Sequence, residues 1–183
     1  MPPRTMAKYD IAILGGDRRT ACMAPVLAEK GYRVVCFRTV SIPCGSSIKS
    51  KLAFTDSLRE ALDSAPVIIG GIPFTRSGSL YCEENTSDAA VSISELQRGI
   101  RKHQKIFAGV IPEDFRKTCE EREISCHDFM LDEPMTLYNA VSTAEGAILE
   151  ALLHKDTNLH MSNTLVLGYG RCGKILADRL KGL

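Results

Sequence analysis

Residues 164–180 read TLVLGYGRCGKILADRL, and this stretch indicates the kind of fold to which the chain belongs. Four residues suited to a buried strand, 164–167, lead into a G-x-G-x-x-G turn, and an amphipathic helical pattern follows. Such a turn between a strand and a helix is typical of dinucleotide-binding domains, where glycines let a pyrophosphate approach the backbone and the helix N-terminus. We therefore expect a cofactor-binding turn that contains Gly168, Tyr169, Gly170, Arg171 and Gly173. The alternative is a plain strand-to-helix turn that uses glycine for geometry alone.

The sequence ends at Leu183, soon after this turn. A dinucleotide-binding domain has further strands, and an acidic residue roughly 20 residues past the glycines holds the ribose. We therefore expect the chain to be a fragment, with residues 161–183 as the start of a domain that binds NAD or NADP. The choice between the two cofactors stays open, because the ribose contact would lie past the last residue.

Charge and composition exclude several classes of protein. The formal net charge is +1 and no dense run of Lys and Arg occurs, which argues against a nucleic-acid-binding surface. No apolar run approaches the roughly 20 residues of a membrane span, and no secretory segment opens the chain. The seven cysteines are odd in number and form no C-x-x-C, and the four histidines are dispersed, so we expect no metal site. These features favour a reduced, cytoplasmic protein.

Short apolar runs alternate with helical patterns over residues 8–130. The predicted strands are 9–14, 32–37, 51–54, 66–69, 105–110 and 123–127, and the predicted helices are 17–30, 56–62, 92–102 and 112–122. Continuously apolar strands between helices favour a parallel sheet covered on both faces. About five strands fit a doubly wound α/β domain of flavodoxin-like or Rossmann-like type. Pro25 predicts a kink in the first helix or a later start for it.

The longest helical pattern, 135–153, lies in a linker region that we place at 131–160. Its apolar stripe consists of Leu137, Val141, Ala144, Ile148 and Leu152. We expect this helix to cross from the first domain to the second. Gly146 in its middle suggests that another backbone passes close by.

Two glycine-rich loops follow predicted strands, at the sheet edge where open α/β domains bind ligands. The first carries Gly16, Asp17, Arg18 and Arg19, with Asp17 as a helix N-cap, and the second is part of a long loop over 74–87. The second contributes Thr75, Arg76 and Ser77. Because arginine can grip a carboxylate with two parallel hydrogen bonds, the loops suit a small acid, such as a dicarboxylate. Each arginine taken alone is more often a solvated surface charge.

The long helix supplies a third group of candidates. Asn139 and Thr143 share one side of the helix and are predicted to contact substrate. Glu145 is the candidate for orienting substrate or transferring a proton, with a solvated helix carboxylate as the alternative. No Ser-His-Asp set can be assembled from the sequence.

Four stretches resemble the family formed by the A subunits of dipicolinate synthase: IAILGGDRR (11–19), GGIPFTRSGSL (70–80), NAVSTAEGAI (139–148) and LVLGYGRCGK (165–174). The resemblance implies a two-domain protein of the dehydrogenase type, whose first domain helps bind substrate and whose second, Rossmann domain binds NAD or NADP. It also implies formation of pyridine-2,6-dicarboxylate, the dicarboxylate of sporulation, from a dihydro or hydroxytetrahydro precursor. The implied partner is a small flavoprotein-like B subunit of dipicolinate synthase.

Two other functions fit the same pattern. A fragment of a D-2-hydroxyacid-dehydrogenase-like oxidoreductase would show the same order of sheet, crossing helix and Rossmann domain. A non-catalytic module that docks a partner protein or binds a metabolite would need only the first domain. The sequence leaves the oligomeric state open, including a homo-oligomer.

Overall fold

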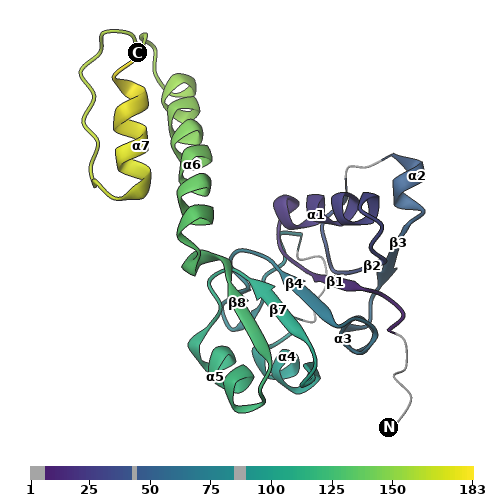
Figure 1. The fold of residues 1–183 in the computed structure, drawn as a ribbon. Coiled ribbons are helices and arrows are strands. Elements are labelled where there is room, and N and C mark those ends of the chain that lie inside the picture. Colours follow the sequence, from purple (N-terminus) through teal and green to yellow (C-terminus); the bar gives the residue numbers. More distant parts are fainter. Residues whose placement is uncertain (1–6, 43–44, 85–89) are drawn as a thin grey trace. The chain divides into compact units, whose positions relative to one another are not determined.

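The structure is a computed structural model that describes residues 7–42, 45–84 and 90–183 (Figure 1). The chain divides into two compact units, residues 1–129 (unit 1) and 130–183 (unit 2), and each is described by itself.

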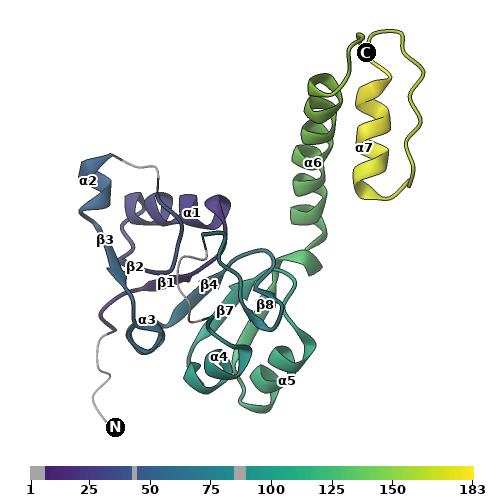
Figure 2. The ribbon, with the colours of Figure 1, turned by 180° about the vertical axis from the view of Figure 1, so that it is seen from behind.

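Unit 1 is built on six parallel strands in the order β3-β2-β1-β4-β7-β8 (Figure 2). They are β1 (Ile11–Leu14), β2 (Val34–Phe37), β3 (Leu52–Thr55), β4 (Val67–Gly70), β7 (Lys105–Ala108) and β8 (Ser125–Asp128). The parallel α/β sheet of the Rossmann type is confirmed, and each of the six predicted strand ranges overlaps one of its strands. The chain passes from β1 outward to β3 and then returns to β4 on the other side of β1. The β1–β4 boundary is therefore the topological switch point, where such sheets bind ligands.

Helices cover both faces of this sheet, and strand periodicity decides which side chains each face receives. Ala12 and Leu14 point toward one core, with α3 (Leu58–Ser64), α4 (Ile93–Gly99) and α5 (Glu113–Glu121). Ile11 and Ile13 point toward the other, with α1 (Arg18–Glu29). Figure 1 shows α1 on one side of the sheet and the other three helices on the opposite side; a short helix, α2 (Ser46–Lys49), precedes β3. Alternate residues of β1 therefore serve two cores.

Local capping signals fix the helix starts. The Asp17 side chain accepts hydrogen bonds from the backbone N–H groups of Arg19 and Thr20, as its N-cap prediction requires. Ser92 and Glu95 form the reciprocal hydrogen bonds of a capping box at the start of α4. Helix α1 begins at Arg18 and continues through Pro25, so the expected later start was wrong. The cap fixes the first turn, and proline removes only one hydrogen bond further along.

A small antiparallel hairpin, β5 (Thr75–Arg76) and β6 (Ser79–Leu80), occupies part of the predicted 74–87 loop. Ser77 and Gly78 connect the strands, and both have positive φ, 50° and 78°. This is the backbone of a two-residue type I′ turn, which matches the twist of the hairpin. The loop prediction was therefore wrong for 75–80, and residues 85–87 lie outside the described residues.

Unit 2 contains a 3₁₀ turn (Phe129–Leu131) at its boundary, α6 (Glu133–Leu153) and α7 (Arg171–Leu180). The strand predicted at 164–167 is absent: Leu165 and Leu167 are 82% and 87% exposed, and no strand of the described chain pairs with them. An apolar run needs a hydrogen-bonding neighbour to become a strand. Residues 164–167 are therefore an irregular segment, and the turn that follows them leads into α7.

The buried side of α6 matches the predicted stripe only in part. Of the stripe, Ala144 is buried and Val141 and Ile148 are half-buried, whereas Leu137 and Leu152 are 43% and 53% exposed. Thr136 and Ala140, which are not in the stripe, are buried. Small side chains allow α6 and α7 to approach closely, so the helix is rotated away from the stripe of large residues. The close backbone expected at Gly146 is absent, since no described atom lies within 4 Å of the position that a Cβ there would take.

Candidate functional site

The two glycine-rich turns meet at the switch point between β1 and β4. A Cβ added to Gly71 would lie 2.6 Å from the Gly16 Cα, so the two backbones are in direct contact. Gly15 and Gly16 both have positive φ, 54° and 82°, which glycine adopts without strain. The Arg19 guanidinium donates a 3.1 Å hydrogen bond to the carbonyl of Ile72. Loops that are 53 residues apart in sequence thus form one corner at the carboxyl edge of the sheet.

A third segment, Tyr81–Glu83, completes this corner. The Gly16 N–H donates to the Tyr81 carbonyl at 2.6 Å, and the Glu83 N–H donates to the Gly16 carbonyl at 3.0 Å. The Cys82 thiol packs against Gly15, since a Cβ added to Gly15 would lie 2.9 Å from the Cys82 Sγ. Burial raises the pKa of the Cys82 thiol, so it stays protonated at neutral pH.

Two carboxylates of the protein accept hydrogen bonds from the backbone N–H groups at the start of α1. Glu83 accepts a 3.1 Å hydrogen bond from the Arg18 N–H, and Asp17 accepts from the N–H groups of Arg19 and Thr20. Burial alone would raise the pKa of Asp17, but the hydrogen bonds and charge of Arg19 outweigh it and hold that pKa below its usual range. The backbone N–H groups at the start of α1, directly after the first glycine-rich loop, are therefore already bound by two carboxylates of the chain.

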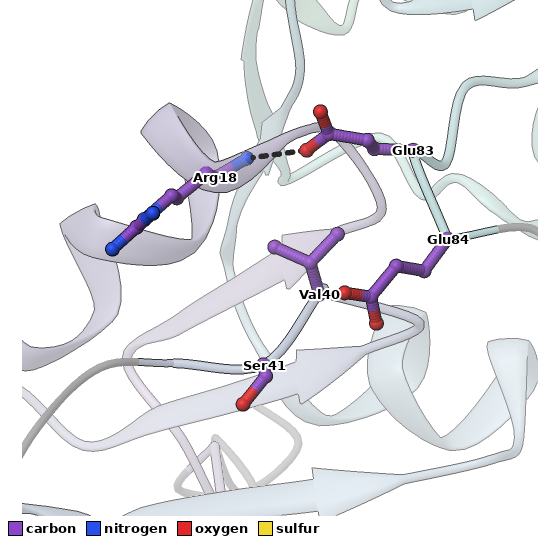
Figure 3. A pocket seen from close by; sticks show the side chains of 5 residues that line it. All are labelled: Arg18, Val40, Ser41, Glu83 and Glu84. Carbon is purple, nitrogen blue, oxygen red and sulfur yellow. Dashed lines mark hydrogen bonds between the residues drawn. The ribbon is translucent and has the colours of Figure 1, made fainter.

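Arg18 lines an open cavity of about 400 Å³ together with Val40, Ser41, Glu83 and Glu84 (Figure 3). The Arg18 side chain extends away from the Glu83 carboxylate, which contacts only its backbone N–H (Figure 3). Two glutamates and one arginine give this cavity a net negative charge. It is therefore a poorer carboxylate site than the sequence suggested.

Arg76 lines a second cavity of about 400 Å³, formed by the hairpin and the segment that follows it. Its guanidinium carbon lies 4.8 Å from the centre of the Tyr81 ring. Ser77 also lines this cavity, whereas Thr75 does not. Glu83 lines both cavities, so it separates the surroundings of Arg18 from those of Arg76. The structure thus joins the two turns but places the two arginines in different cavities.

Tyr81, Glu83 and Glu84 are site residues that sequence reasoning missed. Nothing near them in the sequence indicates that they belong to the site, because the Glu83–Arg18 hydrogen bond joins residues 65 positions apart. A local cue did exist for the hairpin that positions them, because Ser-Gly between short strand patterns is a turn signal.

The predicted residues of α6 belong to unit 2. Thr143 donates its hydroxyl hydrogen to the Asn139 carbonyl at 3.0 Å, a bond within the helix. Glu145 forms an ion pair with Arg179 of α7 at 3.3 Å, and both side chains are largely exposed. Asn139 and Thr143 are exposed as well. These three residues therefore lie on the surface of the α6–α7 hairpin.

The 168–173 turn packs closely on the start of α7, although no strand precedes it. Gly168 has a φ of 101°, and a Cβ on Gly173 would lie 2.0 Å from the Gly168 carbonyl oxygen, so the turn packs tightly on α7. A Cβ on Gly170 would meet no described atom within 4 Å, and Gly170 caps α7 without a side-chain hydrogen bond. The backbone N–H groups at the start of α7 therefore have no side-chain cap from Gly170.

Three charged or aromatic side chains surround this turn. The Arg171 guanidinium donates to the Thr136 hydroxyl on α6. The Lys174 ammonium lies 5.7 Å from the centre of the Tyr169 ring. Arg171 is thus tied to α6, while Tyr169 is 68% exposed beside the open helix start.

Residues 10–130 match a protein family described as the N-terminal domain of the dipicolinate synthase A subunit. The chain belongs to this family. It is 23% identical over 173 residues to the dipicolinate synthase A subunit of Bacillus subtilis (strain 168), covering 94% of this chain and 57% of that protein.

Two solved structures of the family share the fold. The dipicolinate synthase A chain from Bacillus subtilis superposes with a TM-score of 0.69 at 22% identity over 96% of this chain and 58% of its own. The dipicolinate synthase A subunit from Bacillus halodurans gives 0.74 at 18% identity over 97% of this chain and 60% of its own. The chain therefore spans less than two thirds of the length of these relatives.

Neither a metal cluster nor a membrane span is found in the described part of the chain. Among those residues, no group of three or more His, Cys, Asp and Glu side chains is arranged to hold a metal ion. Within the same ranges, every helix is too short or too polar to span a bilayer.

Proposed function

We propose that this chain supplies the substrate-binding part of a longer oxidoreductase that converts a dihydrodipicolinate-type precursor into pyridine-2,6-dicarboxylate. The observation that supports this most is the contact between two arginine-bearing glycine turns at the switch point of a parallel sheet. Membership in the family of dipicolinate synthase A subunits supports the substrate class. The proposal includes the B subunit of dipicolinate synthase for partner and NAD or NADP for cofactor.

Arg76 is the arginine best placed to bind a substrate carboxylate. Its guanidinium lies over the Tyr81 ring, which restrains the side chain. Its N–H groups make no hydrogen bond to the described part of the chain, so they are available for two parallel bonds to a carboxylate. Arg19 is less available, because Asp17 and Ile72 already accept its donors.

Arg18 and Ser77 are the proposed secondary contacts. Arg18 lies in a cavity with Glu83 and Glu84, so an incoming carboxylate would meet like charge there. Ser77 shares the cavity of Arg76 and can donate a hydroxyl hydrogen. A carboxylate would therefore bind in the cavity of Arg76 and Ser77, and Arg18 would add only a weak attraction from the neighbouring cavity.

The turn around Gly170 is the proposed cofactor site of unit 2. The open N–H groups at the start of α7 would bind the pyrophosphate, and Tyr169 would cover it. NAD or NADP bound there would supply the hydride acceptor of the oxidation. Glu145, Asn139 and Thr143 stay proposed substrate-side residues of α6, with Glu145 as the proton acceptor once it separates from Arg179.

Calorimetric titration of pyridine-2,6-dicarboxylate into the purified chain tests the substrate half. We expect saturable binding that Arg76→Ala weakens by about 10- to 100-fold, as loss of charged hydrogen bonds predicts. Arg18→Ala should weaken binding less. Arg59→Ala is the matched control, because this arginine of α3 is 88% exposed and lies outside both cavities. Absence of binding in a folded sample, or equal affinity for Arg76→Ala, would refute the assignment.

A further inference from the structure

Arg76 and Tyr81 form a diagonal pair on one face of the β5–β6 hairpin. Arg76 lies opposite Ser79 in the register of the hairpin, and Tyr81 follows Ser79 by two residues. Residues two apart in an extended strand share a face, and diagonal cross-strand neighbours are within reach of aromatic and long side chains. The Arg76 guanidinium carbon accordingly lies 4.8 Å from the centre of the Tyr81 ring. Tyr81 therefore contacts the arginine that we propose for binding the substrate carboxylate.

Backbone hydrogen bonds fix the position of Tyr81 from two sides. Its N–H donates to the Phe74 carbonyl at 3.0 Å, so the hairpin pairing continues past β6. Its carbonyl accepts from the Gly16 N–H at 2.6 Å, which ties it to the turn before α1. The ring thus starts from a fixed backbone, whereas an arginine side chain has many rotamers to choose from.

Glu83 is a competing partner for Arg76. Both residues line the same cavity, and Glu83 is exposed. In the described part of the chain no ion pair joins the two, and the Glu83 carboxylate accepts a 3.1 Å hydrogen bond from the Arg18 N–H instead. At exposed sites an Arg–Glu ion pair and a cation–π contact are of similar strength. A ring beside Arg76 is therefore enough to decide whether the guanidinium pairs with Glu83.

We propose that Tyr81 is a positioning residue, which holds the Arg76 guanidinium away from Glu83 and so keeps it available to a substrate carboxylate. This inference rests on the proposed function and adds the residue that controls one of its binding groups. Arginine keeps its in-plane donors when it packs against an aromatic ring, so the contact with Tyr81 leaves them for a ligand. An ion pair with Glu83 would use the same donors.

Substitutions of Tyr81 test this role. Tyr81→Leu removes the ring and should weaken binding of pyridine-2,6-dicarboxylate by about 2- to 5-fold, the effect of one exposed cation–π contact. Tyr81→Phe keeps a ring and should restore the affinity of the unaltered chain. Calorimetric titration measures the affinities, and thermal melting followed by circular dichroism checks the fold of each variant. Should Tyr81→Leu not fold, Tyr81→Met serves as the variant without a ring.

Glu83→Gln distinguishes positioning from a structural role, because it removes the competing charge. In this background Tyr81→Leu should cause no comparable loss of affinity. Equal losses in both backgrounds would overturn the inference, since a structural role of Tyr81 does not depend on the charge of Glu83. Unchanged affinity of Tyr81→Leu, with Arg76→Ala still impaired, also overturns it and leaves the proposed function standing. Absence of binding to the unaltered chain overturns both proposals.

Discussion

Two stretches of this chain share one sequence pattern, but only one of them forms a strand. Residues 11–16 (IAILGG) and 164–168 (TLVLG) are both apolar runs that end in glycine before a helix. In unit 1 the run is β1, and Leu14 is 0% exposed between two parallel neighbours. In unit 2 Leu167, at the equivalent place before the glycine, is 87% exposed. An apolar run therefore specifies a strand only where other strands can pair with it.

The largest expected effect comes from truncating these two leucines. Leu14→Ala should lower the free energy of unfolding of unit 1 by about 2–5 kcal/mol, because it leaves a cavity in a closed core. Leu167→Ala should change stability by no more than about 0.5 kcal/mol, as for an exposed site. Urea unfolding followed by far-UV circular dichroism measures both.

Comparable losses for the two variants would contradict the contrast, since they would mean that residues 164–167 are packed in solution. Hydrogen exchange gives a second measurement. The amides of β1 should be protected and those of 164–167 should exchange rapidly.

The second comparison concerns one glycine of the corner in unit 1, Gly71, and one glycine of the 168–173 turn in unit 2, Gly170. Gly71→Ala should destabilise unit 1 by about 1–3 kcal/mol, since the added Cβ would lie 2.6 Å from the Gly16 backbone. Gly170→Ala should have an effect within about 0.5 kcal/mol, because no described atom lies within 4 Å of its Cβ position. Thermal unfolding monitored by calorimetry distinguishes them. A stable Gly71→Ala variant would show that the two turns of the candidate site are not in contact.

The smallest effect concerns the two helix starts, since Asp17 caps α1 and Gly170 caps α7 without a side-chain bond. The folded-state pKa of Asp17 lies below its unfolded value, so its stabilisation is complete above about pH 4 and is lost as pH falls through the folded-state pKa. Asp17→Ala should cost about 1 kcal/mol at pH 7 and flatten part of the acid dependence, because it removes both the N-cap and the carboxylate. Urea midpoints between pH 2 and pH 7 test this, and an unchanged pH profile would contradict it.

Much of unit 1 could be predicted because its signals are local. Asp17 and the Ser92–Glu95 pair each fix a helix start with atoms no more than three residues apart. The continuous apolar runs predicted the parallel sheet, since strands buried on both faces carry no polar alternation. The Arg76 hairpin was missed, although Ser77-Gly78 was a readable turn signal.

The candidate site was harder to predict because its parts come from distant segments. The glycine turns were identified from their place after strands, and their contact followed from a strand order that local sequence does not specify. Glu83 was missed, because nothing near it indicates that its carboxylate reaches the start of α1. Its presence separates Arg18 from Arg76, which a sequence pattern cannot show.

The sequence by itself determined the class of fold, the helix caps and the glycine turns, since these depend on periodicity and on atoms within a few residues. Tertiary structure alone decided that β1 and β4 bring two turns into contact and that residues 164–167 form no strand. The physical reason is that hydrogen bonds between strands and contacts between loops need a partner from elsewhere in the chain. The local sequence pattern limits the secondary structure that a segment can form, and the segments that pack or pair with it decide which one forms.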